Sequence, residues 1–479
     1  MSNLLATLAS SANALEAYGQ VLETTQNNVS NASTPGYAKQ RIDLYALPFD
    51  AQGGVTGGVR AGKLVSTRDE FAEQTVRQQS SGLGYQQQLV ENLTAIQSNF
   101  DISDNQGIPQ ALNNLFQSFS AWGATPDNQA ARQTVVERAT DLAHTFQQAS
   151  NSISAQAHDA EQQIGQTVDQ VNQLVAEIQG YNHIVMQGNK SDGGLSARMH
   201  AALDELAPLV DVNATFQSDG TVSLMLNGET PLLLEDKQYK ISSSLYQPQD
   251  PAPTNANAPA KVRIQGSDGS DITSKTTGAQ LGALLQLRNQ IVPSFIGDAY
   301  QPGDLNVMAK QIADRVNQLL TAGNITDGPP AVPGVPLFTY NTTDVTSTAA
   351  SLSVDPSVTA DQLAAISPGP PEVSNGVPLA LSALASPVQD ADKVNGFSYS
   401  QFYGQLASRV GTVLNDAKNN QDVQQSLLNQ AKDLRQQYQG VSLDEEAAIL
   451  MQFQRAYQAT SKFLSVLDQL TETTINILQ

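Results

Sequence analysis

The sequence predicts a mainly α-helical protein with a β insertion. Long heptad helices from both termini are expected to form a rod-like bundle that carries a small antiparallel β domain. Three observations predict this fold class: apolar residues recur every seven positions near both ends, the centre has an apolar period of two with hairpin dipeptides, and 40% of residues are hydrophobic but only 6% aromatic. So few large side chains favour elongated parts with thin cores.

The N-terminal segment is predicted to be a helix with a narrow coiled-coil stripe. The residues of this stripe are apolar and share one face of a seven-residue repeat: Leu5, Leu8, Leu15, Leu22 and Val29. Pro35-Gly36 follows the stripe. Because proline cannot continue a helix, we expect the helix to end before it.

The C-terminal segment has the same pattern. Its apolar residues occupy one heptad register and the positions three residues further on: Leu450, Phe453, Tyr457, Leu464 and Leu467, with Leu478 continuing the series. Ser442 and Glu445 form a predicted capping box, in which the hydroxyl accepts a hydrogen bond from the backbone of residue 445 and the carboxylate reaches back to the cap. We therefore expect a helix from about residue 443.

Four further helices are expected inside these ends. The longest opens at Thr125-Pro126-Asp127 and extends to about residue 187, and the others cover about 84–100, 305–320 and 399–438. The longest has an apolar row at seven-residue spacing: Ala157, Ile164, Val171, Ile178 and Val185. Such long helices are typical of bundles and rods.

The centre of the chain is predicted to be β-structure. Residues 210–264 alternate apolar and polar positions, and Asp219-Gly220 and Asn227-Gly228 are hairpin dipeptides. The proline-rich stretch 329–387 is expected to be loop-rich, with short strands such as 351–354. The glycines of 53–59 are expected to form a hairpin turn.

These expectations divide the chain into three nested parts. The predicted parts are a terminal coiled-coil assembly domain (1–40 and 440–479), a long-helix bundle rod domain (41–205 and 278–439) with a β- and loop-rich part at 325–396, and an inserted β domain (206–277).

Charge and missing residue types exclude several classes of function. The 479 residues carry 46 Asp and Glu against 25 Lys and Arg, a net charge of −21, so no nucleic-acid binding is expected. The absence of cysteine excludes disulfides, thiolate nucleophiles and Cys-based metal centres. No run approaches about 18 apolar residues, so no membrane span is expected. The first basic residue is Lys39, so no secretory signal peptide is expected.

The sequence contains no arrangement that specifies an enzyme. The densest acidic cluster, 444–446, is better explained as a negatively charged helix start than as acid–base catalysts. The four histidines never occur at i, i+4, and the glycines of 53–59 match no phosphate-binding motif. We expect the histidines to be packing or surface residues. No catalytic, cofactor-binding or metal-ligating residues are therefore predicted.

The two terminal stripes have two interpretations. They either pair with each other in a finished monomer, or they assemble with neighbouring subunits. Heptad spacing alone does not separate these alternatives. Short helices depend on tertiary contacts, which favours ends that become ordered on assembly.

Several segments resemble the axial proteins of the bacterial flagellum. Residues 27–37 (Asn-Asn-Val-Ser-Asn-Ala-Ser-Thr-Pro-Gly-Tyr) resemble their N-terminal signature, and 440–447 with 452–457 (Gly-Val-Ser-Leu-Asp-Glu-Glu-Ala and Gln-Phe-Gln-Arg-Ala-Tyr) resemble the C-terminal one. Inner stretches resemble the hook-associated protein 1 family of the first hook–filament junction: 130–133, 168–172, 281–288 and 304–317. One stretch departs from that family, because 195–199 reads Leu-Ser-Ala-Arg-Met where the family usually has an acidic Leu-Asp-x-Arg-Asp segment.

This resemblance implies a secreted, extracellular structural protein at the hook–filament junction. It implies type III export of the unfolded chain, with an export chaperone bound to the C-terminal helix. The implied partners are the hook protein, the second hook–filament junction protein and further copies of the chain, in a head-to-tail ring of about eleven subunits.

We expect the two stripes to pack against each other and this tip to be buried against hook subunits. Two other functions remain open. The chain resembles, at its ends, a second junction protein or a flagellin as well. It could also be an extracellular adhesin or enzyme with a helical stalk, with that function carried by the β insertion.

Overall fold

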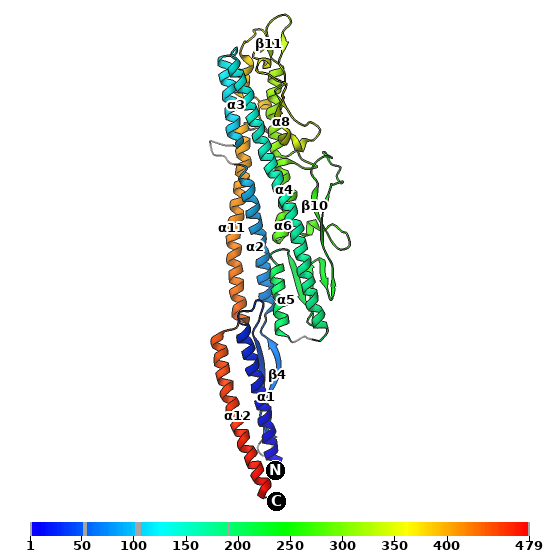
Figure 1. Ribbon diagram of the computed structural model, residues 1–479, viewed down its shortest axis with the longest axis vertical. Helices are drawn as coiled ribbons and strands as arrows, with labels where there is room; N and C mark the ends of the chain where they lie inside the picture. Colours follow the sequence, from blue (N-terminus) through cyan, green and yellow to red (C-terminus); the bar gives the residue numbers. More distant parts are fainter. Residues whose placement is uncertain (1, 51–54, 101–106, 189–191, 478–479) are drawn as a thin grey trace. The chain divides into compact units, whose positions relative to one another are not determined.

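The computed structural model describes residues 2–50, 55–100, 107–188 and 192–477. The chain divides into two compact units. The first unit comprises residues 1–82, 171–239 and 424–479, and the second comprises 83–170 and 240–423. Three long helices contribute segments to both: α2 (Glu70–Gln97), α4 (Gln129–Met186) and α11 (Tyr399–Gln439) (Figure 1).

The first unit contains both terminal helices. These are α1 (Ser2–Asn31) and α12 (Leu443–Ile477). Its other elements are two β-ribbons, one shorter helix and a four-stranded sheet: β1 (Gln40–Ala46), β2 (Phe49–Asp50), β3 (Val55–Thr56), β4 (Val59–Ser66), α5 (Gly193–Leu206), β5 (Val212–Phe216), β6 (Val222–Leu226), β7 (Thr230–Leu234) and β8 (Lys237–Gln238). The sheet has the order β5-β6-β7-β8 and is antiparallel throughout. The ribbon pairs β1 with β4, from Gln40 opposite Ser66 to Ala46 opposite Val59.

The second unit is built from helices and short antiparallel strand pairs, β9–β10, β11–β12 and β13–β14. Its elements are α3 (Gly107–Ala124), β9 (Ser242–Tyr246), β10 (Lys261–Gln265), η1 (Thr273–Lys275), α6 (Ala279–Gln286), the π-helical turn η2 (Leu287–Ile291), α7 (Val292–Ile296), α8 (Asp304–Thr321), β11 (Asn324–Thr326), β12 (Val332–Pro333), β13 (Phe338–Thr339), η3 (Val345–Ser347), α9 (Thr348–Ser351), β14 (Ser353–Val354), η4 (Ala360–Gln362), α10 (Gly376–Ala383) and η5 (Asp390–Asp392).

The predicted fold class, mainly helical with inserted antiparallel β-structure, is confirmed. The long helix α4 covers almost the whole predicted span, and every residue of its predicted apolar row is buried: Ala157, Ile164, Val171, Ile178 and Val185. The predicted helices at 305–320 and 399–438 correspond to α8 and α11. A sustained seven-residue row is a local signal, so it identifies a long helix reliably.

The start predicted for α2 was wrong. The helix begins at Glu70, fourteen residues before the expected Gly84. Asp69 precedes it and accepts a hydrogen bond from the backbone N–H of Ala72 through its Oδ1 atom at 2.8 Å, which is the geometry of an N-cap. Gly82 and Gly84 lie inside the helix, because buried side chains such as Val76 and Leu89 hold it on either side of these residues.

The predicted hairpins of the central sheet are present. Asn227 and Gly228 both have positive φ angles, 47° and 72°, and connect β6 to β7. Asp219 closes the β5–β6 turn, since its Oδ1 accepts from the backbone and hydroxyl of Thr221 at 2.9 and 2.7 Å. The strand expected at 351–354 is limited to β14, because α9 extends to Ser351. Of the turn expected at 53–59, residues 53–54 lie outside the described residues, and Val55 and Thr56 form β3.

The aromatic residues that are buried in the described structure belong to the second unit. Trp122, Phe119 and Phe146 are fully buried there. The rings of Phe100 and Phe295 pack with their centroids 4.8 Å apart. Within the described parts of the chain, no helix combines the length and apolar character that a membrane crossing requires.

Candidate functional site: the paired terminal helices

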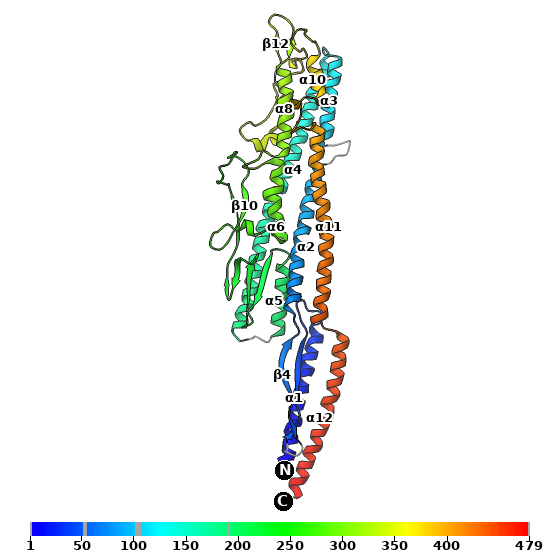
Figure 2. The same ribbon diagram turned by 180° about the vertical axis from the view of Figure 1, so that it is seen from behind.

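The two terminal helices lie side by side within the first unit, as both views of the fold show (Figures 1 and 2). The Tyr18 ring of α1 and the Phe453 ring of α12 pack with centroids 5.7 Å apart. α1 also contacts the ribbon strands β1 and β4. The sequence therefore brings the two predicted stripes together, with the ribbon as a third element.

The most buried face of α1 consists of small and polar residues. It comprises Ser11, Ala14, Ala17, Val21, Thr25 and Asn28. The predicted leucines Leu8, Leu15 and Leu22 are half-buried on the flank of this face, while Leu5 and Val29 are exposed. Small side chains allow α1 to pack closely against both α12 and the β1–β4 ribbon. The centre of its contact face is therefore formed by the residues next to the predicted leucines in the sequence, and not by the leucines themselves.

α12 has apolar residues on two faces. The inner face includes four predicted residues, of which Leu467 is buried and Leu450, Phe453 and Leu464 are half-buried. Tyr457 is 40% exposed. The predicted Leu478 lies outside the described residues.

An outer stripe of α12 is formed by Phe463, Val466 and Leu470, which are about half exposed (51%, 48% and 51%). Their spacing of three and four residues places them on one face of the helix. The heptad reading of the sequence missed this stripe, since it follows only one register.

A polar network connects the N-terminal signature to α12. Asn28 is 1% exposed, and its Nδ2 donates to the Gln40 carbonyl at 2.8 Å and to the Glu446 carboxylate at 3.1 Å. Its Oδ1 accepts from the Gln40 backbone N–H and from the Tyr37 hydroxyl, both at 2.9 Å. All four hydrogen-bonding positions of this amide are therefore used. An asparagine within a heptad helix is the signal that could have identified this residue.

Lys39 joins the same network. Its Nζ atom lies 2.8 Å from Glu445 and 3.0 Å from Glu446. Burial opposes the charge on Lys39, but the two carboxylates outweigh this effect and raise the pKa of Lys39. Ser442 accepts from the Glu445 N–H at 3.4 Å, as the capping box predicts, whereas the Glu445 carboxylate binds Lys39. All three acids of 444–446 lie in the first turn of α12, as the helix-start interpretation predicts, and Glu446 is in addition buried in the contact between the two termini.

A second buried charged group lies beside this contact in the first unit. Glu73 of α2 forms ion pairs with Arg68 and with Arg435, the latter at 3.0 Å, and accepts from the Gln439 amide at 2.7 Å. Burial raises the pKa of Glu73, but Arg68, Gln439 and Arg435 outweigh burial and lower it below its ordinary value. His200 lies 3.7 Å from Glu73. Burial and the nearby arginines hold the pKa of His200 well below its usual range.

The described residues contain no arrangement typical of catalysis. They include no group of three or more histidine, aspartate or glutamate side chains able to hold a metal ion. Three histidines are exposed on α4, and His200 is buried with its ring stacked on that of Phe216, the two centroids 4.9 Å apart.

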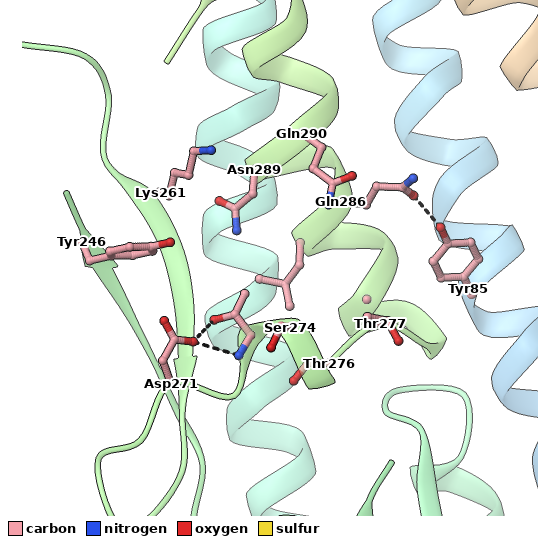
Figure 3. A pocket seen from close by; sticks show the side chains of 13 residues that line it. Tyr85, Tyr246, Lys261, Asp271, Ser274, Thr276, Thr277, Gln286, Asn289 and Gln290 are labelled. Atoms are coloured by element: carbon pink, nitrogen blue, oxygen red, sulfur yellow. Dashed lines mark hydrogen bonds between the residues drawn. The ribbon is translucent and has the colours of Figure 1, made fainter. Parts of the chain in front are cut away.

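An open hollow of about 690 Å³ lies in the second unit, between the β9–β10 pair and the helices around α6 (Figure 3). Two pairs of its polar groups bind each other. Tyr85 donates to Gln286 at 2.5 Å, and Asp271 accepts from the Thr273 hydroxyl at 2.6 Å. This leaves no nucleophile paired with a base.

Comparison with known protein families identifies the chain. The family model of the flagellar hook-associated protein FlgK helical domain matches residues 93–338, just over half of the 479 residues. The chain belongs to the FlgK family. A second model, the C-terminal segment of flagellar basal body rod FlgEFG proteins, matches residues 435–477, which include all of α12.

Members of the FlgK family match along the whole chain. The flagellar hook-associated protein 1 of Bacillus subtilis strain 168 is 24% identical, with 99% of both chains covered. Proteins of the same name from Escherichia coli K12 and Salmonella typhimurium LT2 are each 23% identical, with complete coverage of both chains. The solved structure of the flagellar hook junction protein FlgK from Burkholderia pseudomallei shares the fold, with a TM-score of 0.62 and 16% identity over 77% of this chain and all of that one.

Membership of the FlgK family establishes the class of function. The chain is a structural protein of the bacterial flagellum at the hook–filament junction, and it is not an enzyme. Association with hook and filament components and self-assembly follow from this family. The resemblance inferred from the signatures at residues 27–37 and 440–457 is thereby confirmed.

Proposed function

We propose that this junction protein assembles through the apolar surface that its paired terminal helices leave exposed. The observation that carries the proposal is the outer stripe of Phe463, Val466 and Leu470 on α12. A helix that is apolar on two faces suits a bundle of more than two helices. Because α1 covers only the inner face, the outer stripe requires a further partner.

Other exposed apolar side chains of the first unit support this proposal. They lie on α1, on the ribbon, at the start of α2 and at the start and middle of α12: Leu5, Val29, Tyr45, Phe49, Leu64, Val65, Phe71, Leu443 and Met451. Exposed apolar residues gathered in this number are typical of protein–protein contact surfaces. The ten residues predicted as an assembly interface therefore have two tasks in the proposal: the inner ones pair the helices, and the exposed ones contact neighbours.

The proposed arrangement is a head-to-tail ring of about eleven subunits, since contacts between different surfaces of identical subunits generate rings or tubes. The hook protein and the second hook–filament junction protein would contact opposite sides of this ring. In this proposal the parts of the chain keep their predicted roles: 1–40 and 440–479 for assembly, 41–205 and 278–439 as the helical body with its loop-rich part at 325–396, and 206–277 as the inserted β domain.

Export also belongs to the proposal. The chain would leave the cell unfolded through the type III apparatus and act as a secreted, extracellular protein. Until assembly, an export chaperone would cover the C-terminal helix, because an apolar stripe that is about half exposed favours aggregation. The outer stripe of α12 is the natural surface for such a chaperone, since α1 does not occupy it.

A pair of matched variants tests the assembly proposal. Phe463→Asp places a charge on the outer stripe, and Gln458→Asp places the same charge at an exposed polar position of the same helix. We expect both purified proteins to have unchanged circular dichroism, but only Phe463→Asp to lose its place at the hook tip and to abolish motility. Leu464→Asp, on the inner face, should loosen the helix pair as well. Normal junctions and motility with Phe463→Asp would refute the proposal.

A further inference from the structure

One arginine of the first unit is buried without a counter-ion in contact. Arg77 lies on the inward face of α2, and it is 4% exposed. Its Nη1 atom is shielded from solvent and has no hydrogen-bond partner among the residues that the structure describes. Of the carboxylates that attract Arg77, Glu73 pairs with Arg68 and Arg435, and Asp204 pairs with Arg435 at 2.7 Å. Glu70 attracts Arg77 as well, but forms no ion pair with it. A buried guanidinium without a hydrogen-bonded counter-ion is unfavourable, so a ligand that brings a negatively charged acceptor to Arg77 would be bound strongly.

Arg77 lines a cavity that has the chemistry to hold such a ligand. The cavity has a volume of about 260 Å³ and lies between α2 and the edge of the four-stranded sheet. Its other polar lining residues supply amide and hydroxyl donors, with one acid: Gln74, Gln78, Ser81, Asp211, Asn213 and Asn227.

We propose that this cavity binds a carboxylate group and that Arg77 anchors it. The planar guanidinium matches a carboxylate in geometry and holds it through two parallel hydrogen bonds. The amides of Gln74 and Gln78 would add neutral donors at the rim. Asp211, the acid of the lining, disfavours a doubly charged anion, so a singly charged carboxylate fits better than phosphate.

The carboxylate has two possible sources. One is the acidic side chain of a second copy of the chain, which carries 46 acidic against 25 basic residues. The other is a free small carboxylic acid. The chemistry at Arg77 is the same for both, and the experiment below separates them.

The first part of the test measures thermal unfolding of the full chain in acetate and in chloride at equal ionic strength. Acetate at a concentration ten times its dissociation constant should lower the equilibrium constant for unfolding about elevenfold, because it binds only the folded protein. Arg77→Gln should remove this difference. Because Arg77→Gln could itself disturb folding, Gln78→Glu provides a second variant: it adds a negative charge at an exposed rim position and should weaken acetate binding about tenfold.

The matched control is Gln87→Glu, the same change at an exposed position of α2 outside the cavity lining, which should keep the full acetate effect. An acetate effect that is equal in the wild type, Arg77→Gln and Gln78→Glu would overturn the proposal. A phosphate effect as large as that of acetate would overturn the assignment to a carboxylate.

The second part identifies the source by sedimentation of the concentrated protein. If a second copy supplies the carboxylate, acetate and Gln78→Glu should each weaken self-association, and Gln87→Glu should not. If a free acid is the ligand, acetate should still stabilise the fold through Arg77 while self-association stays the same.

Discussion

Replacing the buried Asn28 with alanine should strongly weaken the connection between the N-terminal signature and α12. The substitution removes an amide that makes four hydrogen bonds, two with the Gln40 backbone, one with Tyr37 and one with the Glu446 carboxylate. Asn28 is buried, so water does not readily replace these partners.

The expected loss follows from counting these bonds. Three neutral hydrogen bonds contribute about 1 kcal/mol each, and one to a carboxylate contributes about 1.5–3 kcal/mol. Partial relaxation and residual solvation reduce the sum, so we expect Asn28→Ala to destabilise the helix pair by about 3–5 kcal/mol. Asn27→Ala is the matched control. Asn27 is an exposed neighbour whose side chain accepts from Tyr37 and Asn31, and its replacement should cost less than about 1 kcal/mol.

Native-state hydrogen exchange is the appropriate assay, because a chain with two compact units need not unfold in one step. The free energy of opening should fall by the stated amount for amides of 14–28 in α1 and 449–467 in α12. A double-mutant cycle with Glu446→Gln should give a coupling energy of about 1–3 kcal/mol. Equal effects of Asn28→Ala and Asn27→Ala would refute the reasoning, as would a wild-type protein without protection in these segments.

Three further predictions concern backbone geometry, pH and an unpaired hydroxyl. Gly36 has φ +70°, and an added Cβ would lie 2.2 Å from the Ala197 carbonyl oxygen, so Gly36→Ala should destabilise the first unit by about 2–5 kcal/mol in urea unfolding. The depressed pKa of His200 keeps this side chain neutral in the folded protein, whereas in the unfolded chain it binds a proton near pH 6.5. The free energy of unfolding should therefore be highest above that pH and fall by up to about 1.4 kcal/mol per pH unit below it. His200→Phe should reduce this pH dependence. Tyr399 is buried, and its hydroxyl has no hydrogen-bond partner among the described residues, so Tyr399→Phe should raise the melting temperature. Tyr403→Phe should lower the melting temperature, because the Tyr403 hydroxyl donates to the Asn99 carbonyl at 3.3 Å.

The long helices could be predicted because their signals are local. Each residue of the α4 row, such as Ile164 and Ile178, repeats at a fixed spacing and faces the interior for the same reason as its neighbours. Hairpin dipeptides such as Asn227-Gly228 are equally local, because the positive φ angles are a property of the turn itself. For these elements the burial of one helix face, or the geometry of one turn, determines both the sequence pattern and the structure.

The contact face of α1 could not be predicted in this way. A heptad reading selects the largest apolar side chains, such as Leu15 and Leu22, and assumes a single partner helix. α1 contacts α12 and the ribbon together, so the small residues Ala14 and Ala17 occupy the centre. The polar group around Glu73 was missed for a related reason: its members come from segments more than 350 residues apart, and no local pattern indicates their contact.

The first unit separates two tasks that a simple heptad assigns to the same residues. Buried polar groups determine how α1 meets α12, since the amide of Asn28 and the carboxylate of Glu446 satisfy each other in only one register. The apolar surface is then available for other molecules, because the stripe of Phe463, Val466 and Leu470 takes no part in that register. Asn28→Leu loses the same four hydrogen bonds as Asn28→Ala but keeps an apolar side chain in the contact, so it should weaken helix pairing less than Asn28→Ala does. Without the polar contact the register of the two helices should slip, which would misplace the outer stripe. We thus expect Asn28→Leu to impair assembly without preventing helix pairing, and pairing with unimpaired assembly would show that the polar contact does not determine the register.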